Sequence, residues 1–242
     1  MPASHFGMNE SLDIYLLIGQ SNMAGRGKLG EVSALRDPRV FMYRDGRWII
    51  AEEPLHRDKP SIAGVGLGMS FAMEFLHARR TAIGLVPCAV GGTPLSRWIP
   101  GADLYVNAVS VTKQAMSHGT LRGILWHQGE SDSGKLEDAS SYGQRFRHMI
   151  GSLRAELSQA DVPVVAGELG AFLKGYPGAD FFAVVNQHLR NLEQSLPAYG
   201  CVSAEGLIDN GDNLHFNAGS LSEFGRRYAA RFVELEKMTG RS

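Results

Sequence analysis

The sequence has few of the residues that cross-link a chain or bind structural metals. Its 242 residues include two cysteines, Cys88 and Cys201, which lie far apart in apolar, strand-like surroundings. We expect two buried thiols there, with a disulfide as the less favoured alternative. No group of cysteine and histidine residues has the spacing of a zinc site, so the sequence predicts a protein without a metal or other cofactor.

Long apolar runs are also missing. No stretch approaches the roughly 18 apolar residues that mark a membrane-spanning helix. Residues 1–10, which include His5 and Glu10, contain no apolar run of the length found in a signal peptide. The chain is therefore expected to be cytoplasmic, and a secreted form whose signal peptide has been removed is the alternative.

Neither sign of charge dominates. Lys and Arg together number 24 and Asp and Glu number 25, which gives a formal net charge of −1. A near-neutral chain without a basic run has no bulk electrostatic attraction to nucleic acid or to an anionic membrane. We therefore expect neither as a partner, and the sequence indicates no oligomeric state.

Short apolar runs alternate with longer amphipathic segments along the chain. The expected strands are residues 14–19, 40–43, 48–50, 82–90, 121–126, 162–169 and 200–203, and the expected helices are 69–80, 104–116, 142–157, 181–196 and 218–238. This alternation indicates right-handed crossovers and a parallel sheet covered on both faces. Because no repeat, low-complexity tract or linker is present, residues 1–242 are expected to form a single α/β domain.

The residues that follow each strand carry the functional interpretation, because open parallel sheets bind ligands at the carboxyl ends of their strands. Ser21 follows the first strand, within Gly19-Gln20-Ser21-Asn22-Met23-Ala24. Its hydroxyl can face the crevice as a nucleophile, and its backbone N–H is free to donate to an oxyanion. The alternative is a plain helix N-cap, a position that serine favours.

Two further strand ends carry groups of the same kind. Gly91 and Gly92 follow the strand at 82–90, where glycine lets a ligand approach a bare backbone N–H, although a plain turn is the commoner use of such a pair. The string His127-Gln128-Gly129-Glu130-Ser131-Asp132 follows the strand at 121–126. A side-chain amide there could be a second oxyanion donor, and a polar loop with helix-capping acids is the alternative.

Near the end of the chain, Asp212 precedes His215 by three residues in a polar, glycine-containing loop before the last helix. An acid that orients a histidine, beside a serine that the histidine deprotonates, is the arrangement that acyl transfer requires. A helix-start motif is the other interpretation of these two residues.

The order of these strings is more specific than any one of them. Gly-Gln-Ser-Asn-Met-Ala, Ala-Val-Gly-Gly-Thr, His-Gln-Gly-Glu-Ser-Asp and Asp-Asn-Leu-His-Phe together resemble the SGNH hydrolases over residues 12–228. They look most like the carbohydrate-acetylesterase branch, which includes sialate O-acetylesterases and acetylxylan esterases. The resemblance implies a flavodoxin-like three-layer α/β/α fold with a parallel sheet of about five strands, and no metal. It also implies removal of O-acetyl groups from a carbohydrate, such as acetylated xylan or O-acetyl sialic acid, through an acyl-enzyme intermediate.

Carried over by position, the resemblance implies that Ser21 is the nucleophile and His215 the general base. The oxyanion hole would use the backbone N–H groups of Ser21 and Gly91 and the side-chain amide of Gln128. Many SGNH enzymes have an asparagine in place of this glutamine. Gln20 is expected beside these donors, on the oxyanion and substrate-binding side of the site.

Two roles stay open. The acid that orients His215 is either Asp212, which is favoured because it shares the loop, or Glu130, which follows a neighbouring strand. Trp98, in the segment after the double glycine, is either a stacking platform for a sugar or a core residue.

Competing motifs fail at named positions. Residue 23 is methionine where the elbow of an α/β-hydrolase has glycine, and Gly27-Lys28 is followed by Leu29, which breaks a phosphate-binding loop. Gly64, Gly66 and Gly68 precede a helix but do not follow a strand, so they do not indicate a dinucleotide site. The remaining alternatives are a short-chain thioesterase or lipase-like SGNH hydrolase and a non-catalytic carbohydrate-binding protein on the same fold.

Overall fold

A computed structural model describes residues 11–78 and 81–239 of the protein. The expected lack of a signal peptide in residues 1–10, and the last two residues of the helix expected at 69–80, lie outside this part. Within it, no helix is both long enough and apolar enough to cross a membrane. The cytoplasmic location and the single domain stay predictions.

Seven strands form one sheet in the order β3-β2-β4-β1-β5-β6-β7. Their bounds are β1 Leu12–Gly19, β2 Val40–Arg44, β3 Arg47–Ile50, β4 Ile83–Pro87, β5 Gly119–His127, β6 Val164–Gly167 and β7 Tyr199–Val202. All neighbouring strands are parallel except β2 and β3, which pair antiparallel. The fold class is confirmed, but the strand count of about five is wrong. Asp45 and Gly46 both have positive φ and form the hairpin turn between β2 and β3. These two strands extend a sheet that otherwise has five.

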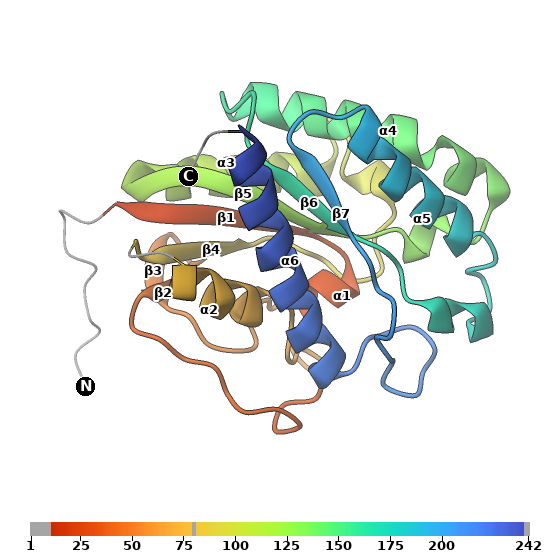
Figure 1. Ribbon diagram of the computed structural model, residues 1–242, viewed down its shortest axis with the longest axis horizontal. Helices are drawn as coiled ribbons and strands as arrows, with labels where there is room; N and C mark the ends of the chain where they lie inside the picture. The colour runs from red at the N-terminus through yellow and green to blue at the C-terminus, as the bar shows by residue number, and fades with distance from the viewer. Residues whose placement is uncertain (1–10, 79–80, 240–242) are drawn as a thin grey trace.

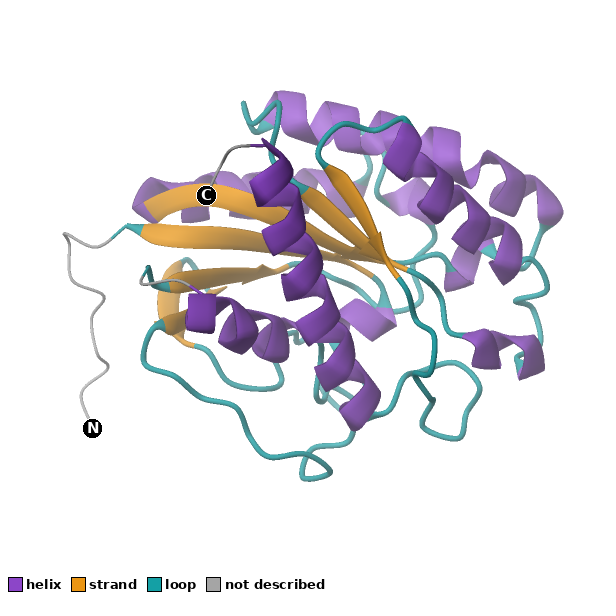
Figure 2. Cartoon of the chain, viewed as in Figure 1, coloured by secondary structure: helices purple, strands orange, loops and turns teal. Residues whose placement is uncertain are grey.

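Helices cover both faces of this sheet, as Figures 1 and 2 show. The α-helices are α1 Ser21–Ala24, α2 Gly68–Ala78, α3 Asp103–Ala115, α4 Leu136–Glu156, α5 Phe182–Asn191 and α6 Ala218–Thr239. Five 3-10 turns lie between them: η1 Leu95–Arg97, η2 Met116–His118, η3 Glu130–Asp132, η4 Ala171–Gly175 and η5 Leu192–Gln194. α2 and α6 pack on one face and α3, α4 and α5 on the other, which gives three layers.

The central strand β1 shows why the sheet is buried on both faces. Ile14, Leu16 and Ile18 enter the apolar cluster beneath α3, α4 and α5, whereas Tyr15 and Leu17 enter the cluster beneath α2 and α6. Successive side chains of a strand point to opposite faces, so an unbroken apolar run suits a strand covered by helices twice. β1 therefore holds its carboxyl end, where Ser21 follows, in a rigid place.

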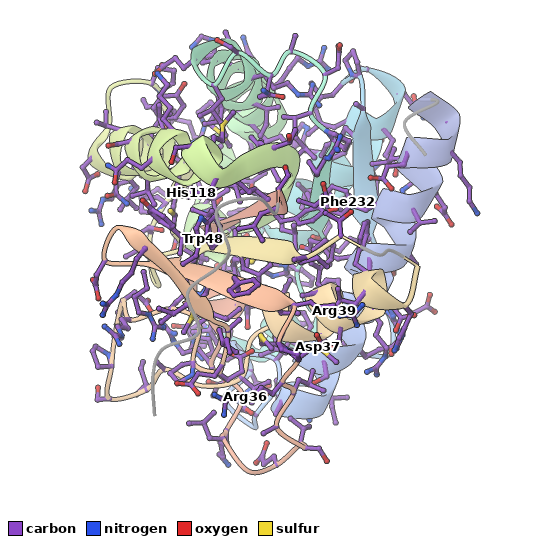
Figure 3. All side chains as sticks on the ribbon, turned by 90° about the vertical axis from the view of Figure 1, so that its left-hand side faces the viewer. Arg36, Asp37, Arg39, Trp48, His118 and Phe232 are labelled. Atoms are coloured by element: carbon purple, nitrogen blue, oxygen red, sulfur yellow. The ribbon has the colours of Figure 1, made fainter. Side chains whose placement is uncertain are left out.

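Figure 3 views the molecule from the end at which β1 begins. Asp37 and Arg39 form an ion pair on the segment that leads into β2, where Asp37 also accepts a hydrogen bond from the Arg39 backbone. Trp48 on β3 packs edge-on against Tyr43 on β2. The contacts at this end shape the entry into the strands, whereas the residues predicted for catalysis follow the strands at the other end.

The two cysteines are free thiols, as predicted. Cys88 is buried just after β4, and Cys201 is half-buried in β7. In the sheet, β1, β5 and β6 lie between β4 and β7. Burial raises the pKa of both thiols to about 12, so neither is poised to react as a thiolate.

Candidate active site

β1 delivers Ser21 to the carboxyl edge of the sheet. Gln20 is the N-cap of the short helix α1, and Ser21 is its first helical residue, with no capping hydrogen bond from the preceding side chain. The Ser21 side chain is nearly buried, and its Oγ lies 3.1 Å from Nε2 of His215. The N-cap interpretation of Ser21 is therefore wrong, because the hydroxyl faces a histidine 194 residues away.

The loop that carries His215 closes on itself before α6 begins. Asp209 and Phe216 form an antiparallel bridge, and the Asn210 N–H donates to the His215 carbonyl at 2.8 Å. Gly211 adopts a positive φ at the tip, which glycine does without steric cost. This geometry turns residues 209–216 into a compact unit that presents His215 to Ser21.

Asp212 lies within hydrogen-bond distance of His215 at two points. Its Oδ2 lies 2.7 Å from His215 Nδ1, and its Oδ1 accepts from the His215 backbone N–H at 2.8 Å. A hydrogen on Nδ1 is needed for the first contact, because an ionised carboxylate only accepts. Nε2 is then left as the acceptor that faces the Ser21 hydroxyl.

The electrostatics of this pair favour an ionised acid. Partial burial alone would raise the pKa of the Asp212 carboxyl, but hydrogen bonds from the His215 backbone and ring hold that pKa below its ordinary value. The Asp212 side chain is 45% exposed and that of His215 is 19% exposed, so this half of the site faces solvent.

Glu130 is placed differently from Asp212. Its side chain is buried, its Oε1 accepts a 2.6 Å hydrogen bond from Asn22, and the same oxygen lies 3.6 Å from His127 Nε2. Burial would raise the pKa of this carboxyl, but its contacts with His127 and Asn22 lower that pKa overall. Asp212 is thus hydrogen-bonded to His215, whereas Glu130 is hydrogen-bonded to Asn22, the residue after Ser21.

Asn22 links that buried acid to the histidine loop. Its Nδ2 donates to the Leu214 carbonyl at 3.1 Å as well as to Glu130, and its Oδ1 accepts from the Phe216 N–H at 3.0 Å. Leu214 and Phe216 flank His215 in the chain. Among the described contacts, Glu130 therefore reaches His215 through Asn22 and the backbone of Leu214 and Phe216.

Gln128 does not offer the free amide that an oxyanion donor needs. Its side chain is fully buried, and Nε2 has three acceptors: Gln20 Oε1 at 3.1 Å, the Thr93 carbonyl at 3.1 Å and Asp132 Oδ2 at 2.7 Å. Because an amide nitrogen carries two hydrogens, none is left for a substrate oxygen. We correct the expectation for Gln128: it cross-links the strand ends, and the glutamine of the motif points into the protein.

Gln20 belongs to the same network and is also corrected. It is 2% exposed, and its Oε1 faces the Gln128 amide and the backbone N–H groups of Gly129 and Ser131. A side chain enclosed in this way has no surface to present to a substrate. It holds the residue before Ser21 against the loop that follows β5.

Trp98 proves to be a core residue. It is 1% exposed, its indole N–H donates to Thr93 Oγ1 at 3.1 Å, and its ring meets that of Trp126 edge-on. Its ring faces are covered by protein, so stacking on a sugar is the interpretation that fails. The segment after the double glycine is anchored by this ring.

Gly91 is brought beside Ser21 by β4, but its N–H is engaged. It donates to Asp58 Oδ2 at 2.7 Å, and the same oxygen lies 2.5 Å from Nη2 of Arg26. A methyl group added to Gly91 would lie 2.5 Å from Arg26 Nη2, 3.0 Å from Asp58 Oδ2 and 3.3 Å from Ser21 Cβ. A side chain at this position would press on the ion pair and on Ser21.

Asn22, Arg26 and Asp58 are parts of the site that sequence reasoning missed. Asn22 and Arg26 lie within or just after the string around Ser21, so their position was a usable signal. Asp58 lies in a loop that follows no expected strand of the parallel sheet, and nothing in its spacing indicates a site. No group of three or more His, Cys, Asp or Glu is arranged for a metal ion in residues 11–78 and 81–239.

Comparisons with known proteins identify the family of the chain. The sequence model of a family described as "Carbohydrate esterase, sialic acid-specific acetylesterase" matches residues 11–234. A probable carbohydrate esterase from Arabidopsis thaliana is 33% identical over 241 residues, which span 91% of this chain and 90% of that protein. A solved structure of an Arabidopsis thaliana protein has a TM-score of 0.86 at 30% identity, over 93% of this chain and 98% of that one. A carbohydrate acetylesterase from Xanthomonas citri shares the fold, with a TM-score of 0.70 at 22% identity, over 93% of this chain and 57% of that one.

Proposed function

Since the chain belongs to the family of sialic acid-specific carbohydrate acetylesterases and is a carboxylic ester hydrolase, we propose that it removes O-acetyl groups from a carbohydrate through an acyl-enzyme on Ser21. The observation that carries this proposal is the chain of contacts Ser21 Oγ–His215 Nε2–Asp212, with distances of 3.1 Å and 2.7 Å. A serine, a base and an acid that orients the base are the three groups that acyl transfer by serine needs.

In the first half-reaction, Ser21 Oγ attacks the acetyl carbonyl carbon while His215 Nε2 takes the hydroxyl proton. The tetrahedral intermediate collapses as the bond to the sugar oxygen breaks, and His215 returns the proton to that leaving oxygen. Asp212 stabilises the imidazolium that forms in between, without taking its proton. Water then repeats the cycle on the acetyl-serine and releases acetate, with His215 again as base and then acid.

The matching family supports a small acyl group, because its description names an acetylesterase. An acetyl group is the smallest acyl group that sugars commonly carry. An acetylated sugar, from xylan or another oligosaccharide or from sialic acid, is the substrate class that we propose.

The first experiment removes the nucleophile. Ser21→Ala should reduce kcat for acetate release at least 10³-fold, since loss of the nucleophile in serine hydrolases costs about 10⁴ to 10⁶. A fluorophosphonate should label the parent enzyme once, at Ser21, and should not label the variant. Ser203→Ala, at an exposed serine after β7, is the matched control and should keep both activities.

Near-normal turnover of Ser21→Ala would overturn the proposal. The substrate class is tested by acetate release from acetylated xylan, O-acetylated sialic acid and simple acetyl sugars. Hydrolysis of p-nitrophenyl acetate should exceed that of p-nitrophenyl octanoate, and the opposite preference would point to a lipase-like enzyme. Binding of acetyl sugars without turnover would point to a carbohydrate-binding protein.

A further inference from the structure

One side-chain oxygen already occupies the Gly91 N–H, which is the backbone donor expected for the oxyanion. Asp58 Oδ2 accepts from the Gly91 N–H at 2.7 Å and lies 2.5 Å from Arg26 Nη2. A backbone N–H has one hydrogen, so a second oxygen can use the Gly91 donor only after Asp58 has left it. The Asp58 carboxylate therefore marks a built anion position beside Ser21.

The pair that makes this position is buried yet incompletely satisfied. The side chains of Arg26 and Asp58 are 3% and 2% exposed. Within the described residues, Arg26 Nε and Asp58 Oδ1 are buried and have no hydrogen-bond partner. Buried polar atoms are normally paired, and leaving them unpaired costs free energy. Arg26 Nε and Asp58 Oδ1 can therefore form hydrogen bonds with a ligand.

The segment that carries Asp58 contrasts with the buried carboxylate. Arg57, Lys59, Pro60, Ser61 and Ile62 are all exposed, whereas Leu55 and His56 just before them are buried. Arg26 instead directly follows the glycine that ends α1, and its Nη1 donates to the Gly25 carbonyl at 2.8 Å. Because exposed Arg57 and Lys59 flank Asp58, the Asp58 side chain can rotate outwards, whereas the Arg26 guanidinium is tied to the segment that holds Ser21.

We propose that Arg26 is a further catalytic residue, which stabilises the oxyanion of the tetrahedral intermediate, and that Asp58 is its resting counter-ion, which the ester carbonyl oxygen replaces. This inference rests on the proposed function of Ser21. The incoming oxygen takes the Gly91 N–H and Arg26 Nη2 as donors, and the Asp58 carboxylate turns towards solvent without a change of protonation.

Charge explains why such an exchange favours the transition state. A neutral ester oxygen compensates the Arg26 charge less well than the Asp58 carboxylate does. As Ser21 attacks, that oxygen gains a negative charge and restores the balance that Asp58 provided at rest. Only interactions that are stronger in the transition state than in the ground state accelerate the chemical step, and this one meets that condition. It also supplies the side-chain donor that Gln128 does not.

Kinetics of two variants separate the roles. In Asp58→Asn the neutral amide should be displaced more readily, so KM for p-nitrophenyl acetate should fall about 3- to 10-fold. Arg26→Met combined with Asp58→Asn leaves no unpaired buried charge, and its kcat should fall a further 10²- to 10³-fold, the usual cost of one oxyanion donor. Equal kcat in the two variants would overturn the role of Arg26. A 100-fold loss of kcat in Asp58→Asn alone would overturn the exchange.

A binding measurement tests the anion position without any turnover. Formate is titrated calorimetrically into Ser21→Ala and into Ser21→Ala with Asp58→Ala, after thermal melts have shown that both are folded. Formate should bind at least tenfold more tightly when Asp58 is gone, because it can then occupy the space between Gly91 and Arg26. Asp103→Asn, which breaks an exposed ion pair with Arg97, is the control and should leave formate binding unchanged.

The two proposals fail separately. Equal formate affinity with and without Asp58, in a protein whose Ser21→Ala variant is inactive, would overturn this inference and leave the proposed function standing. An active Ser21→Ala variant would remove the esterase mechanism itself, whatever formate does.

Discussion

The two sides of Ser21 are built in opposite ways. On the base side, Asp212 and His215 lie three residues apart in one loop, and the Asp212 side chain is 45% exposed. On the oxyanion side, Gly91, Arg26 and Asp58 come from three separate segments, and the charged pair is almost fully buried. The first side is a local turn in contact with water, and the second is an ion pair enclosed by the fold.

The two sides therefore differ in how much they cost the stability of the fold. An exposed acid is well solvated, so the base side orients a proton acceptor at little cost in stability. A buried ion pair is expensive to desolvate, and it becomes strongly destabilising when one partner is removed alone. We therefore expect variants on the base side to lose activity while they stay folded, and variants that remove a buried partner on the oxyanion side to lose stability, whatever they do to activity.

The largest effect should come from the base side. Asp212→Asn keeps the shape of the side chain but removes the charge and allows the wrong histidine tautomer, so kcat should fall on the order of 10⁴-fold with little change in Tm. Glu130→Gln is the matched comparison and should cost about tenfold or less, because Glu130 reaches the histidine loop only through Asn22. Steady-state kinetics with parallel thermal melts measure both, and the reverse order would make Glu130 the acid of the triad.

A methyl group at Gly91 should have the next largest effect. Gly91→Ala pushes against Arg26, Asp58 and Ser21 at once, so we expect kcat/KM to fall about 100-fold, the scale of one lost oxyanion donor. Gly151→Ala in α4 is the control, since a methyl there meets no atom within 4 Å. Unchanged kinetics in Gly91→Ala would show that the Gly91 N–H takes no part in the reaction.

Gln128 tests whether a buried amide of the oxyanion side is structural or catalytic. Gln128→Ala removes the buried hydrogen bonds to Gln20, Thr93 and Asp132, so the free energy of unfolding should fall by about 3 kcal/mol. Turnover per folded molecule should fall less than tenfold. Denaturant titration and active-site labelling give the two numbers, and a 100-fold loss of kcat at full stability would restore Gln128 as an oxyanion donor.

The smallest expected effect is a dependence of stability on pH from the buried side. Burial lowers the pKa of His56 to about 4, so the folded state leaves this ring neutral where the unfolded chain protonates it. Its contribution is therefore present above about pH 6.5 and is lost as the pH falls towards 4. The free energy of unfolding should decrease by about 2 kcal/mol between pH 7 and pH 5 from this residue alone.

Denaturant titrations at these two pH values measure that slope. His56→Gln should flatten it, whereas His118→Gln, at an exposed histidine, should keep it. A slope that is the same in His56→Gln as in the parent protein would assign the acid sensitivity to other groups.

The sequence predicted the layers of the fold and the base side of the site for the same reason. Strand periodicity, apolar runs and an acid three residues from a histidine are short-range features, and each is decided by neighbouring residues. Ser21 and His215 were singled out because each follows or precedes a recognisable element. The strands at 40–43 and 48–50 were also predicted, and only their addition to the main sheet widened the fold beyond expectation.

The oxyanion side could not be predicted because it depends on side-chain direction and on long-range pairing. The string around Gln128 indicates that an amide follows β5, but only the positions of Gln20, Thr93 and Asp132 decide that it points inward. Asp58 meets Gly91 across 33 positions in the chain, from a loop without any periodic pattern. Spacing along a sequence carries no information about such a pairing.

The 194 positions between Ser21 and His215 have a consequence for the timing of synthesis. A ribosome that adds about 5 to 20 residues per second makes the nucleophile roughly 10 to 40 s before it makes the base. β1, at the middle of the sheet, must also wait for β4 before one of its edges is paired and for β5 before the other is. A nascent or truncated chain that ends before residue 215 thus carries Ser21 without its base. The contact between Ser21 and His215 therefore forms late in translation, when the loop before α6 reaches a sheet that is already in place.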